Sequence, residues 1–424
     1  MNLHLLAFDF RHTPIALREK VAFPEYKLSD ALQALQQSGA CEAAILSTCN
    51  RVELIAQVPS SVDGRQMLFS FLSRWHDLSQ SELEPHSCHL TNEDAARRLM
   101  RIACGLESLV PGEMQILGQV KQAAHLARQA GTLGKVLNSM FDKALKAGRR
   151  ARHETKIARR PVSISHVAVN LIQQQLGRDL SGCRVLLIGS GKMGEVAAQQ
   201  LHKAGATHFM VANRTLDSAC KLAQRWNGQA LSLDEIYGSL SQVDAVICAT
   251  SAPHLILHRE ELAQAMRKRE AQPLLLIDLA VPRDIDPSAN EIAGITLCDV
   301  DGLQAVVADN IALRNEERED VERIIQQQLK KWQAEQAARR VAPTITSLRG
   351  SIEKMRQKEL EKALGRLSHL NDKERSVVES LTWRLMNQFL HEPTVRLRKM
   401  AATNEGARFQ QTVEELFALK GESA

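Results

Sequence analysis

The sequence predicts an α/β multidomain protein in three parts: an α+β N-terminal domain over residues 1–155, a Rossmann-like doubly wound domain over residues 156–301, and an all-α C-terminal domain over residues 302–424. Strand-like and helix-like segments are mixed in the first part, apolar runs alternate with helical stretches in the second, and strand-like runs end before the third. The chain has 424 residues, more than one hydrophobic core usually holds. Its 44% hydrophobic and 24% charged residues are typical of a globular protein.

The N-terminal domain is predicted from three strand-like runs, LHLLAFDF, AAILST and VELIAQV, which begin at residues 3, 43 and 52. The polar segment STCNR leads from the second run to the third and contains Cys49. Most free cysteines are small buried hydrophobic residues. The neighbouring Arg51 and the polar surroundings favour the thiolate, which is the nucleophilic form. Cys49 is therefore either a structural residue or a nucleophile.

A basic segment closes the N-terminal domain. Residues 121–161 contain 11 Lys or Arg and two acidic residues, a balance of +9 in a chain whose net charge is +5. Such a segment is either a nucleic-acid footprint or the solvated face of a helix. The charge pattern alone leaves both interpretations open.

The second domain is predicted from five apolar runs separated by helical stretches, a pattern typical of a parallel sheet covered on both faces. The runs are RVLLI, HFMVA, DAVICAT, PLLLIDLA and ITLCDV, between residues 184 and 300. The motif GSGKMG directly follows the first run and opens a helix, as the dinucleotide-binding fold requires. Its first glycine permits a tight turn, its second lets the backbone approach a pyrophosphate, and its third allows close helix packing. The predicted cofactor-binding residues of this motif are Gly189, Ser190, Gly191, Lys192, Met193 and Gly194.

The end of the second apolar run predicts which dinucleotide binds. Sites specific for NAD usually place an acidic residue there, on the ribose hydroxyls, whereas this chain has Asn213, Arg214 and Thr215. Arg214 and Thr215 suit a 2′-phosphate, so the sequence predicts NADPH as the cofactor. The alternative is a surface turn that binds no ligand.

A long helix is predicted from Gly302 to about residue 340, because this stretch has no proline or glycine after its first residue. Apolar residues at helical spacing share one of its faces: Val321, Ile324, Ile325, Leu329 and Trp332. The chain is again helical in composition from Pro343 onward. We predict a dimerisation module and hence a homodimer; the alternative is a monomeric helical bundle.

The sequence predicts a cytoplasmic protein without a metal site. The N-terminus lacks a basic region followed by an apolar signal core, and no run of about 18 apolar residues occurs. The eight cysteines include no C-x-x-C pair, so neither a disulfide framework nor a zinc ribbon is predicted. His86, Cys88 and His89 are close in sequence, but no second cluster of ligands accompanies them.

Seven segments together resemble the glutamyl-tRNA reductase family: STCNRVEL, ACGLESLVPGEMQILGQVK, ALKAGRRARHETKI, VLLIGSGKMGE, NRT, IDLAVPRDID and LHEPTVRLR. They occur in the family's order along the chain. The resemblance implies NADPH-dependent reduction of glutamyl-tRNA to glutamate 1-semialdehyde with release of the tRNA, the first step of five-carbon tetrapyrrole synthesis. It implies as partners glutamyl-tRNA, a second copy of the chain and, transiently, glutamate-1-semialdehyde aminomutase.

The resemblance also implies site residues. Cys49 would attack the ester carbonyl of the glutamate and form a thioester. Arg51 would pair a substrate carboxylate, within a glutamate pocket formed by Thr48, Arg51, Ser108, Glu113 and Gln119. The tRNA backbone would be faced by Arg149, Arg150 and Arg152, which makes the affinity dependent on salt.

One position departs from the family. Where the family usually carries a histidine that supports the cysteine, this chain has Arg98. An arginine cannot act as a general base near neutral pH, but it can stabilise a thiolate or a developing oxyanion. His89 is a candidate to replace the histidine.

Two alternatives to the reductase belong to other classes. One is a non-catalytic relative that binds aminoacyl-tRNA or NADPH for regulation, and Arg98 is the feature that favours it. The other is a thioester-forming dehydrogenase of a small acyl compound, which would share the thiol and the cofactor. This second alternative leaves the basic segment and the matching motifs unexplained.

Overall fold

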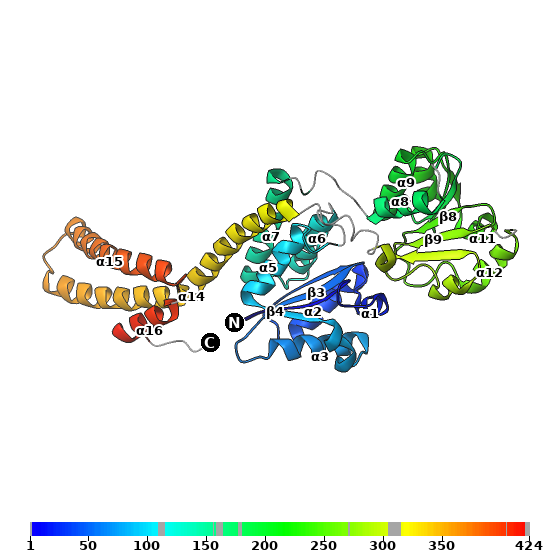
Figure 1. Cartoon of the computed structure of the whole chain (residues 1–424). Coiled ribbons are helices and arrows are strands. Elements are labelled where there is room, and N and C mark those ends of the chain that lie inside the picture. Colours follow the sequence, from blue (N-terminus) through cyan, green and yellow to red (C-terminus); the bar gives the residue numbers. More distant parts are fainter. Residues whose placement is uncertain are drawn as a thin grey trace. The chain divides into compact units, whose positions relative to one another are not determined.

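The computed structural model describes residues 2–108, 115–155, 157, 164–176, 180–269, 272–303, 315–403 and 405–419. Contacts between residues divide the chain into two compact units, Met1–Ile325 and Gln326–Ala424. The first unit contains an α+β domain and a doubly wound domain, and the described part of the second unit is helical (Figure 1). The predicted fold class is therefore confirmed.

An antiparallel sheet of four strands forms the centre of the N-terminal domain. Its strands are β1 (Asn2–Asp9), β2 (Glu42–Thr48), β3 (Arg51–Val58) and β4 (Cys88–Thr91), in the order β2-β3-β1-β4. The three predicted runs are all strands. Every residue of β3 is buried, because this central strand is covered on both faces.

The two faces of this sheet carry different helices, because successive side chains of a strand point to opposite faces. α3 (Gly64–His76) lies against His4 of β1, and α5 (Asn92–Ala103) lies against Asp9, on the other face of the same strand. α6 (Gln115–Gln129) and α7 (Lys135–Glu154) pack beside α5 and along β2. The shorter elements are α1 (Ile15–Val21), α2 (Leu28–Gln37) and α4 (Gln80–Leu83), with 3-10 turns at Glu25–Lys27 and Glu84–His86.

The second domain of the first unit is a parallel sheet of six strands in the order β10-β9-β8-β5-β6-β7. The strands are β5 (Arg184–Ile188), β6 (His208–Ala212), β7 (Gln229–Leu231), β8 (Ala245–Cys248), β9 (Leu274–Asp278) and β10 (Ile295–Asp299). The five predicted runs are strands, whereas β7 has only three residues and is too short to produce a recognisable pattern. The strand order reverses between β5 and β8, and dinucleotides bind at such a switch point, beyond the carboxyl ends of the strands.

Two hydrophobic cores cover the two faces of the parallel sheet. On one face, Val185 and Leu187 pack with α8 (Ile164–Leu176), α9 (Lys192–Lys203) and α10 (Leu216–Arg225). On the other face, Leu186 and Ile188 pack with the segment that contains α11 (Ile236–Ser239), α12 (Arg259–Arg267) and 3-10 turns at Leu233–Glu235 and Pro287–Glu291. Burial on both faces explains why these strands read as continuous apolar runs.

The predicted end of the long helix near residue 340 is wrong. α14 (Asn315–Arg366) continues through Pro343 for 52 residues in all. Val341 and Ile345, on either side of this proline, are buried in one core with Leu397 of α15 (Asp372–Met400), so tertiary packing outweighs the tendency of proline to break a helix. α16 (Gly406–Leu416) completes the domain. None of the described helices is both long and apolar enough to cross a membrane.

Candidate active site

Cys49 lies at the tip of a β-hairpin. Thr48 at the end of β2 pairs with Arg51 at the start of β3, which leaves Cys49 and Asn50 as the two residues of the turn. The carbonyl oxygen of Asn50 accepts a hydrogen bond of 3.1 Å from the backbone N–H of Phe10, and that of Cys49 accepts one of 3.1 Å from Nη1 of Arg18. The thiol is half-exposed and is not part of a disulfide. Two long-range contacts therefore fix the backbone that presents the sulfur.

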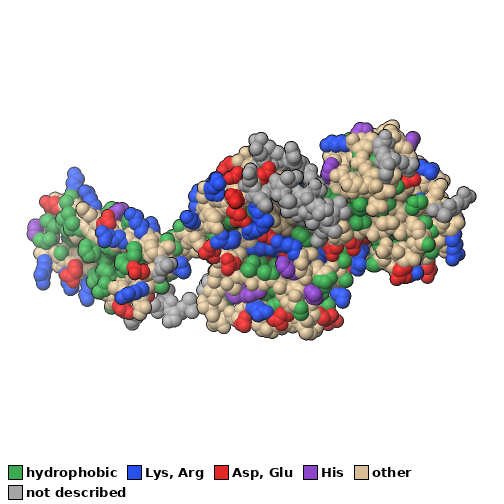
Figure 2. Space-filling model, in the orientation of Figure 1, with side chains coloured by type: hydrophobic (Ala, Val, Ile, Leu, Met, Phe, Trp, Pro, Cys, Tyr) green, Lys and Arg blue, Asp and Glu red, His purple; other side chains and the backbone are tan. Residues whose placement is uncertain are grey.

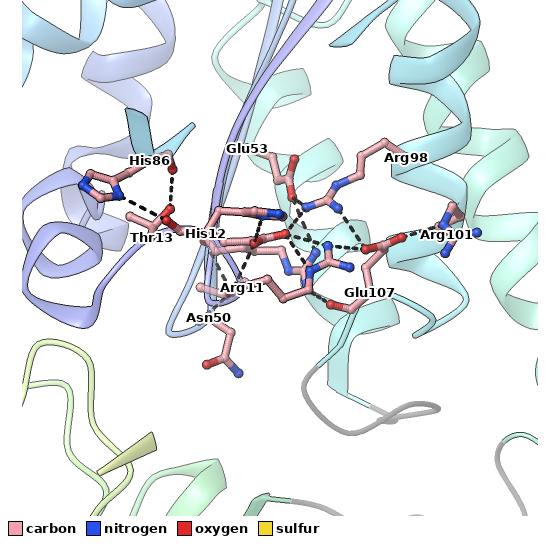
Figure 3. Close-up of polar contacts among 12 residues, drawn as sticks. Arg11, His12, Thr13, Asn50, Glu53, His86, Arg98, Arg101 and Glu107 are labelled. Atoms are coloured by element: carbon pink, nitrogen blue, oxygen red, sulfur yellow. Dashed lines mark hydrogen bonds and ion pairs between the residues drawn. The ribbon is translucent and has the colours of Figure 1, made fainter. Parts of the chain in front are cut away.

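A buried network of charged side chains lies on the α5 face of the sheet, close to this hairpin (Figure 3). Arg98 of α5 is at its centre and is 9% exposed. Its Nη2 donates to Asp9 at 2.7 Å and to Glu53 at 2.9 Å, and its Nη1 donates to Glu107 at 2.9 Å. The network is completed by three further arginines that contact the same carboxylates, Arg11, Arg51 and Arg101.

The mutual attraction in this network outweighs the penalty of burial for its central members. Burial by itself opposes every one of these charges. Nevertheless Arg98, Arg101 and Arg11 lower the pKa of Glu107 to about 2, and Arg11 and Arg98 lower that of Asp9. The carboxylates of Glu53, Glu107 and Asp9 in turn raise the pKa of Arg98 above its ordinary value. Asp9, Glu107 and Arg98 are therefore ionised at neutral pH.

Three polar atoms beside the hairpin are buried and have no hydrogen-bond partner among the described residues: Asn50 Oδ1, Arg51 Nε and Ser108 Oγ. Arg51 is 1% exposed, and burial lowers the pKa of its guanidinium despite the nearby carboxylate of Glu53. A negatively charged ligand group beside Arg51 would restore the stability of its charged form. The hairpin thus adjoins a site suited to a small polar anion.

The glycine motif of the second domain forms a cradle at the carboxyl end of β5. Gly189 has φ of +104°, and a Cβ atom there would lie 2.5 Å from the carbonyl oxygen of Ala249, so only glycine fits. A Cβ at Gly194 would collide with the carbonyl of Gly189. A Cβ at Gly191 would meet no atom within 4 Å, and Gly191 is the N-cap of α9. An open backbone at a helix N-terminus is the arrangement that accepts a pyrophosphate.

The NRT segment follows β6, the strand beside β5. Asn213 donates from Nδ2 to the carbonyl oxygen of Thr215 at 3.3 Å, and Thr215 is the N-cap of α10. Arg214 is exposed. A depression beside this segment carries two cations, Lys221 and Arg225, and is lined by Ser190, Glu195, Ser218, Lys221, Leu222 and Arg225. Arg225 is ion-paired with Glu195 of the same lining, and the cation Lys221 with the hydroxyls of Ser190 and Ser218 suits a phosphate group.

Comparisons with known proteins agree with this geometry. Residues 6–155 match the N-terminal domain of glutamyl-tRNA(Glu) reductase, residues 170–306 match shikimate/quinate 5-dehydrogenase, and residues 320–419 match the dimerisation domain of glutamyl-tRNA(Glu) reductase. A glutamyl-tRNA reductase from Desulforudis audaxviator is 37% identical over 425 residues, which is 100% of this chain and 95% of that protein. The Bacillus subtilis glutamyl-tRNA reductase is 35% identical over 403 residues, 95% of this chain and 88% of that protein. The chain belongs to the glutamyl-tRNA reductase family.

A solved structure of a family member supports the same assignment. The glutamyl-tRNA reductase from Methanopyrus kandleri is 30% identical to this chain, covers 99% of both chains and has a TM-score of 0.51. The three-part architecture of the family is therefore present in full. The C-terminal helices form its dimerisation domain.

Arg98 has a different environment from the one expected for a residue that supports the thiol of a glutamyl-tRNA reductase. Both of its Nη atoms donate to carboxylates, so in the structure Arg98 holds Asp9, Glu53 and Glu107 together. His89 does not replace the usual histidine either. It stacks on His4, whose Nδ1 lies 3.1 Å from its Nε2, on the α3 face of the sheet and away from Arg98.

The remaining predicted substrate residues of this family member lie on different elements. Thr48 adjoins Cys49, with its Oγ1 accepting from the N–H of Asn50 at 3.3 Å. Ser108 is buried, and Gln119 is half-buried on α6, which packs along β2. Glu113, which is also predicted to line the pocket, lies outside the described residues.

The three predicted tRNA arginines differ from one another. Arg149 is exposed on α7. Arg150 is half-exposed and forms an ion pair with Glu154, four residues away. Arg152 turns inward and donates to the carbonyl oxygens of Gly148 at 2.9 Å and Ala103 at 3.2 Å, so it caps the end of α5. Arg152 is half-exposed and supports the fold through these bonds.

Sequence reasoning missed Asp9, Glu53 and Glu107 as members of the site. One signal was available for Glu53, because Arg51 and Glu53 are two positions apart on a strand and share a face. Asp9 lies 89 residues before Arg98, and nothing in its local sequence identifies this partner.

Proposed function

We propose that Cys49 of this reductase is the nucleophile that takes glutamate from glutamyl-tRNA, and that NADPH reduces the resulting thioester to glutamate 1-semialdehyde. Family membership supports the overall reaction. The observation that carries the mechanism is the position of Cys49 at a hairpin tip, held by Phe10 and Arg18 and adjoining unpartnered buried polar atoms.

The chemistry follows from two activated acyl groups, the ester of glutamyl-tRNA and the thioester formed on Cys49. The Cys49 sulfur attacks the ester carbonyl carbon, the bond to the terminal ribose oxygen breaks, and the tRNA leaves with the proton. This step needs no ATP, because an ester and a thioester are both activated acyl derivatives. When bound, NADPH supplies the hydride that reduces the thioester; cleavage of the C–S bond then returns the thiolate of Cys49 and releases the aldehyde.

The substrate glutamate is placed beside the hairpin in this proposal. Arg51 pairs one carboxylate of the glutamate. The Nε atom of the buried Arg51 guanidinium has no hydrogen-bond partner among the described residues and is available for this contact. Ser108 and Asn50 offer the other unpartnered polar atoms, and Thr48 adjoins the sulfur. Gln119 and Glu113 complete the predicted pocket. Through its ion pairs, Arg98 keeps Glu53 and Glu107 in position beside Arg51. In this proposal Arg98 does not take part in the chemistry.

The tRNA binds, in this proposal, along the exposed cations of α6 and α7. Arg149 and Arg150 belong to this surface together with other exposed or half-exposed residues, Lys121, Arg128, Lys135, Lys143 and Lys146. Contacts of this kind with phosphates carry no sequence information but fix the register of the nucleic acid. The reactive semialdehyde favours transfer to a consuming enzyme, so we also propose a transient complex with an aminomutase.

The cofactor is proposed to bind at the Gly189–Gly194 cradle, with Asn213, Arg214 and Thr215 at the 2′-phosphate. The open space over Gly191 and the cation Lys221, which lines the same depression as Ser190, support this placement. The regulatory alternative rested on Arg98, and the three carboxylate partners of Arg98 support a structural role for this residue instead.

One experiment tests the thioester. Purified protein is incubated with tRNA carrying radiolabelled glutamate, without NADPH, and covalently bound label is measured. We expect label on the wild type and on Cys41→Ser, a control at an exposed cysteine, and none on Cys49→Ser. Addition of NADPH should release the label as semialdehyde. Equal labelling of Cys49→Ser would refute the role of Cys49.

A further inference from the structure

The helix α1 contacts both the Cys49 hairpin and the cofactor domain through two adjacent residues of opposite charge. Glu19 accepts three hydrogen bonds from Arg283, which follows β9 in the cofactor domain. Its Oε1 accepts from the backbone N–H at 2.7 Å and from Nε at 2.9 Å, and its Oε2 accepts from Nη2 at 2.8 Å. A bidentate pair of this kind is stronger and more directional than an ordinary surface ion pair.

Arg18, the preceding residue, is 2% exposed and is shared among three groups. Its Nη1 donates to the carbonyl oxygen of Cys49, its Nε donates to the carbonyl oxygen of Thr13 at 3.1 Å, and its Nη2 forms an ion pair with Asp301, just beyond β10. One guanidinium therefore links the backbone of the nucleophile to the cofactor domain.

The loop that Glu19 contacts is itself tied to the cofactor cradle. The carboxylate of Asp278 accepts hydrogen bonds of 2.9 Å from the backbone N–H groups of Ala280, Asp284 and Ile285, and so fixes the loop around Arg283. Asp284 in turn accepts from the backbone N–H of Thr250 at 2.9 Å and from its Oγ1 at 2.5 Å.

Thr250 also forms part of the wall of the glycine turn. A Cβ atom on Gly189 would lie 3.1 Å from the nitrogen of Thr250. A continuous set of hydrogen bonds and packing contacts therefore leads from Glu19 through Arg283, Asp284 and Thr250 to the turn that receives the pyrophosphate.

We propose that Arg18 and Glu19 are positioning residues for the hydride step. They hold the cofactor domain against α1 so that the Gly189–Gly194 cradle is aligned with the Cys49 hairpin. The two ion pairs have opposite polarity, Arg18 with Asp301 and Glu19 with Arg283, so a displaced docking would bring like charges together. Arg18 adds the link to the nucleophile, because the same side chain holds the Cys49 carbonyl.

This inference rests on the proposed thioester mechanism and separates its two steps. Acylation of Cys49 uses the N-terminal domain, whereas reduction of the thioester requires that domain and the cofactor domain together. Loss of the Glu19–Arg283 pair should therefore slow the reduction and spare acylation. A residue that only stabilises the fold would affect both steps alike.

The test measures the two steps separately in the full-length protein. The labelled thioester is formed without NADPH, and its reduction is then followed in a single turnover after NADPH is added. We expect Glu19→Gln and Arg283→Glu to form the thioester at the wild-type rate but to reduce it at least tenfold more slowly. The charge-exchanged double variant, Glu19→Arg with Arg283→Glu, should recover part of the reduction rate. Glu84→Gln removes a surface ion pair of the N-terminal domain with Arg65, and both steps should keep their wild-type rates.

Each outcome bears on the proposal. Wild-type reduction rates in Glu19→Gln and Arg283→Glu, or an equal loss of both steps without recovery in the double variant, would overturn the docking role while leaving the thioester mechanism intact. Failure of the wild type to form a thioester would overturn the mechanism and the docking role together. Because Glu19→Gln keeps the shape of the side chain, it tests the role even if the charge-reversed variants do not fold.

Discussion

Nη1 of Arg98 lies 2.9 Å from the carboxylate of Glu107. This contact joins α5 to the residue directly before Ser108, a predicted member of the glutamate pocket. Arg98 also binds Asp9 and Glu53, on two neighbouring strands. Breaking one partner of a buried ionic network leaves the others buried without compensation, which is strongly destabilising. The arginine at this position is therefore tied to the carboxylates around it.

We predict that Arg98→His lowers the stability of the N-terminal domain by about 3–5 kcal/mol. A histidine is too short to reach all three carboxylates, so at least one of them would lose its buried ionic partner. Differential scanning calorimetry of the full chain should show an earlier transition. Arg97→His is the matched control, because Arg97 lies on the same helix, forms an ion pair with Glu93 and is more exposed than Arg98. An unchanged melting temperature in Arg98→His would mean that the network contributes little.

The same network predicts the acid sensitivity of the protein. Arg98, Arg101 and Arg11 overcome the effect of burial and lower the pKa of Glu107 to about 2, from an ordinary value of 4.5. As the pH falls, Glu107 is therefore protonated in the unfolded chain before it is protonated in the folded chain. The stabilisation is complete above about pH 5 and is lost as the pH falls toward 2. Melting temperatures of the wild type should fall across this window, and those of Glu107→Gln should fall less. Parallel curves for the two proteins would contradict the assignment.

Local patterns in the sequence predicted the strands around Cys49 and the glycine cradle, because each depends on neighbours along the chain. AAILST and VELIAQV are recognisable as strands, and the glycines of GSGKMG follow one directly. The contacts that complete the site depend on tertiary structure. The pairs Arg98–Asp9 and Arg283–Glu19 span 89 and 264 residues, and no local pattern encodes either. The passage of α14 through Pro343 likewise depends on packing against α15.

Cofactor preference is predicted to depend on Arg214. Its guanidinium is exposed, and we propose that it contacts the 2′-phosphate of NADPH. A charge-assisted hydrogen bond of this kind contributes about 1.5–3 kcal/mol. Arg214→Gln should therefore weaken NADPH binding roughly 10- to 100-fold and leave NADH binding nearly unchanged. Fluorescence titration with both nucleotides measures the two affinities. Arg184→Gln, at the amino end of β5 and so at the opposite end of the strand from the cradle, is the control. Equal weakening of both nucleotides by Arg214→Gln would exclude a contact with the 2′-phosphate.

The dimerisation domain exposes an apolar stripe that we predict to be covered by a second copy of the chain. Its members are four residues apart along α15: Val377, Leu381, Leu385 and Phe389, which are 55–67% exposed. Figure 2 shows green apolar side chains at the surface of this helical part. Solvent-exposed residues of this size in one row are typical of an interaction surface, and this domain matches the family's dimerisation domain.

Leu381→Glu and Phe389→Glu should each raise the dissociation constant of the dimer by about 100-fold or more, because a charge would replace a central apolar contact. Sedimentation velocity over a range of protein concentrations should then show monomers where the wild type is dimeric. Arg398→Glu changes an exposed residue of the same helix outside the stripe and should leave the dimer intact. Since α15 keeps its buried contacts through Leu390 and Leu397, the monomers should retain wild-type helix content. Dimers of unchanged affinity in both stripe variants would place the interface on another face of the domain.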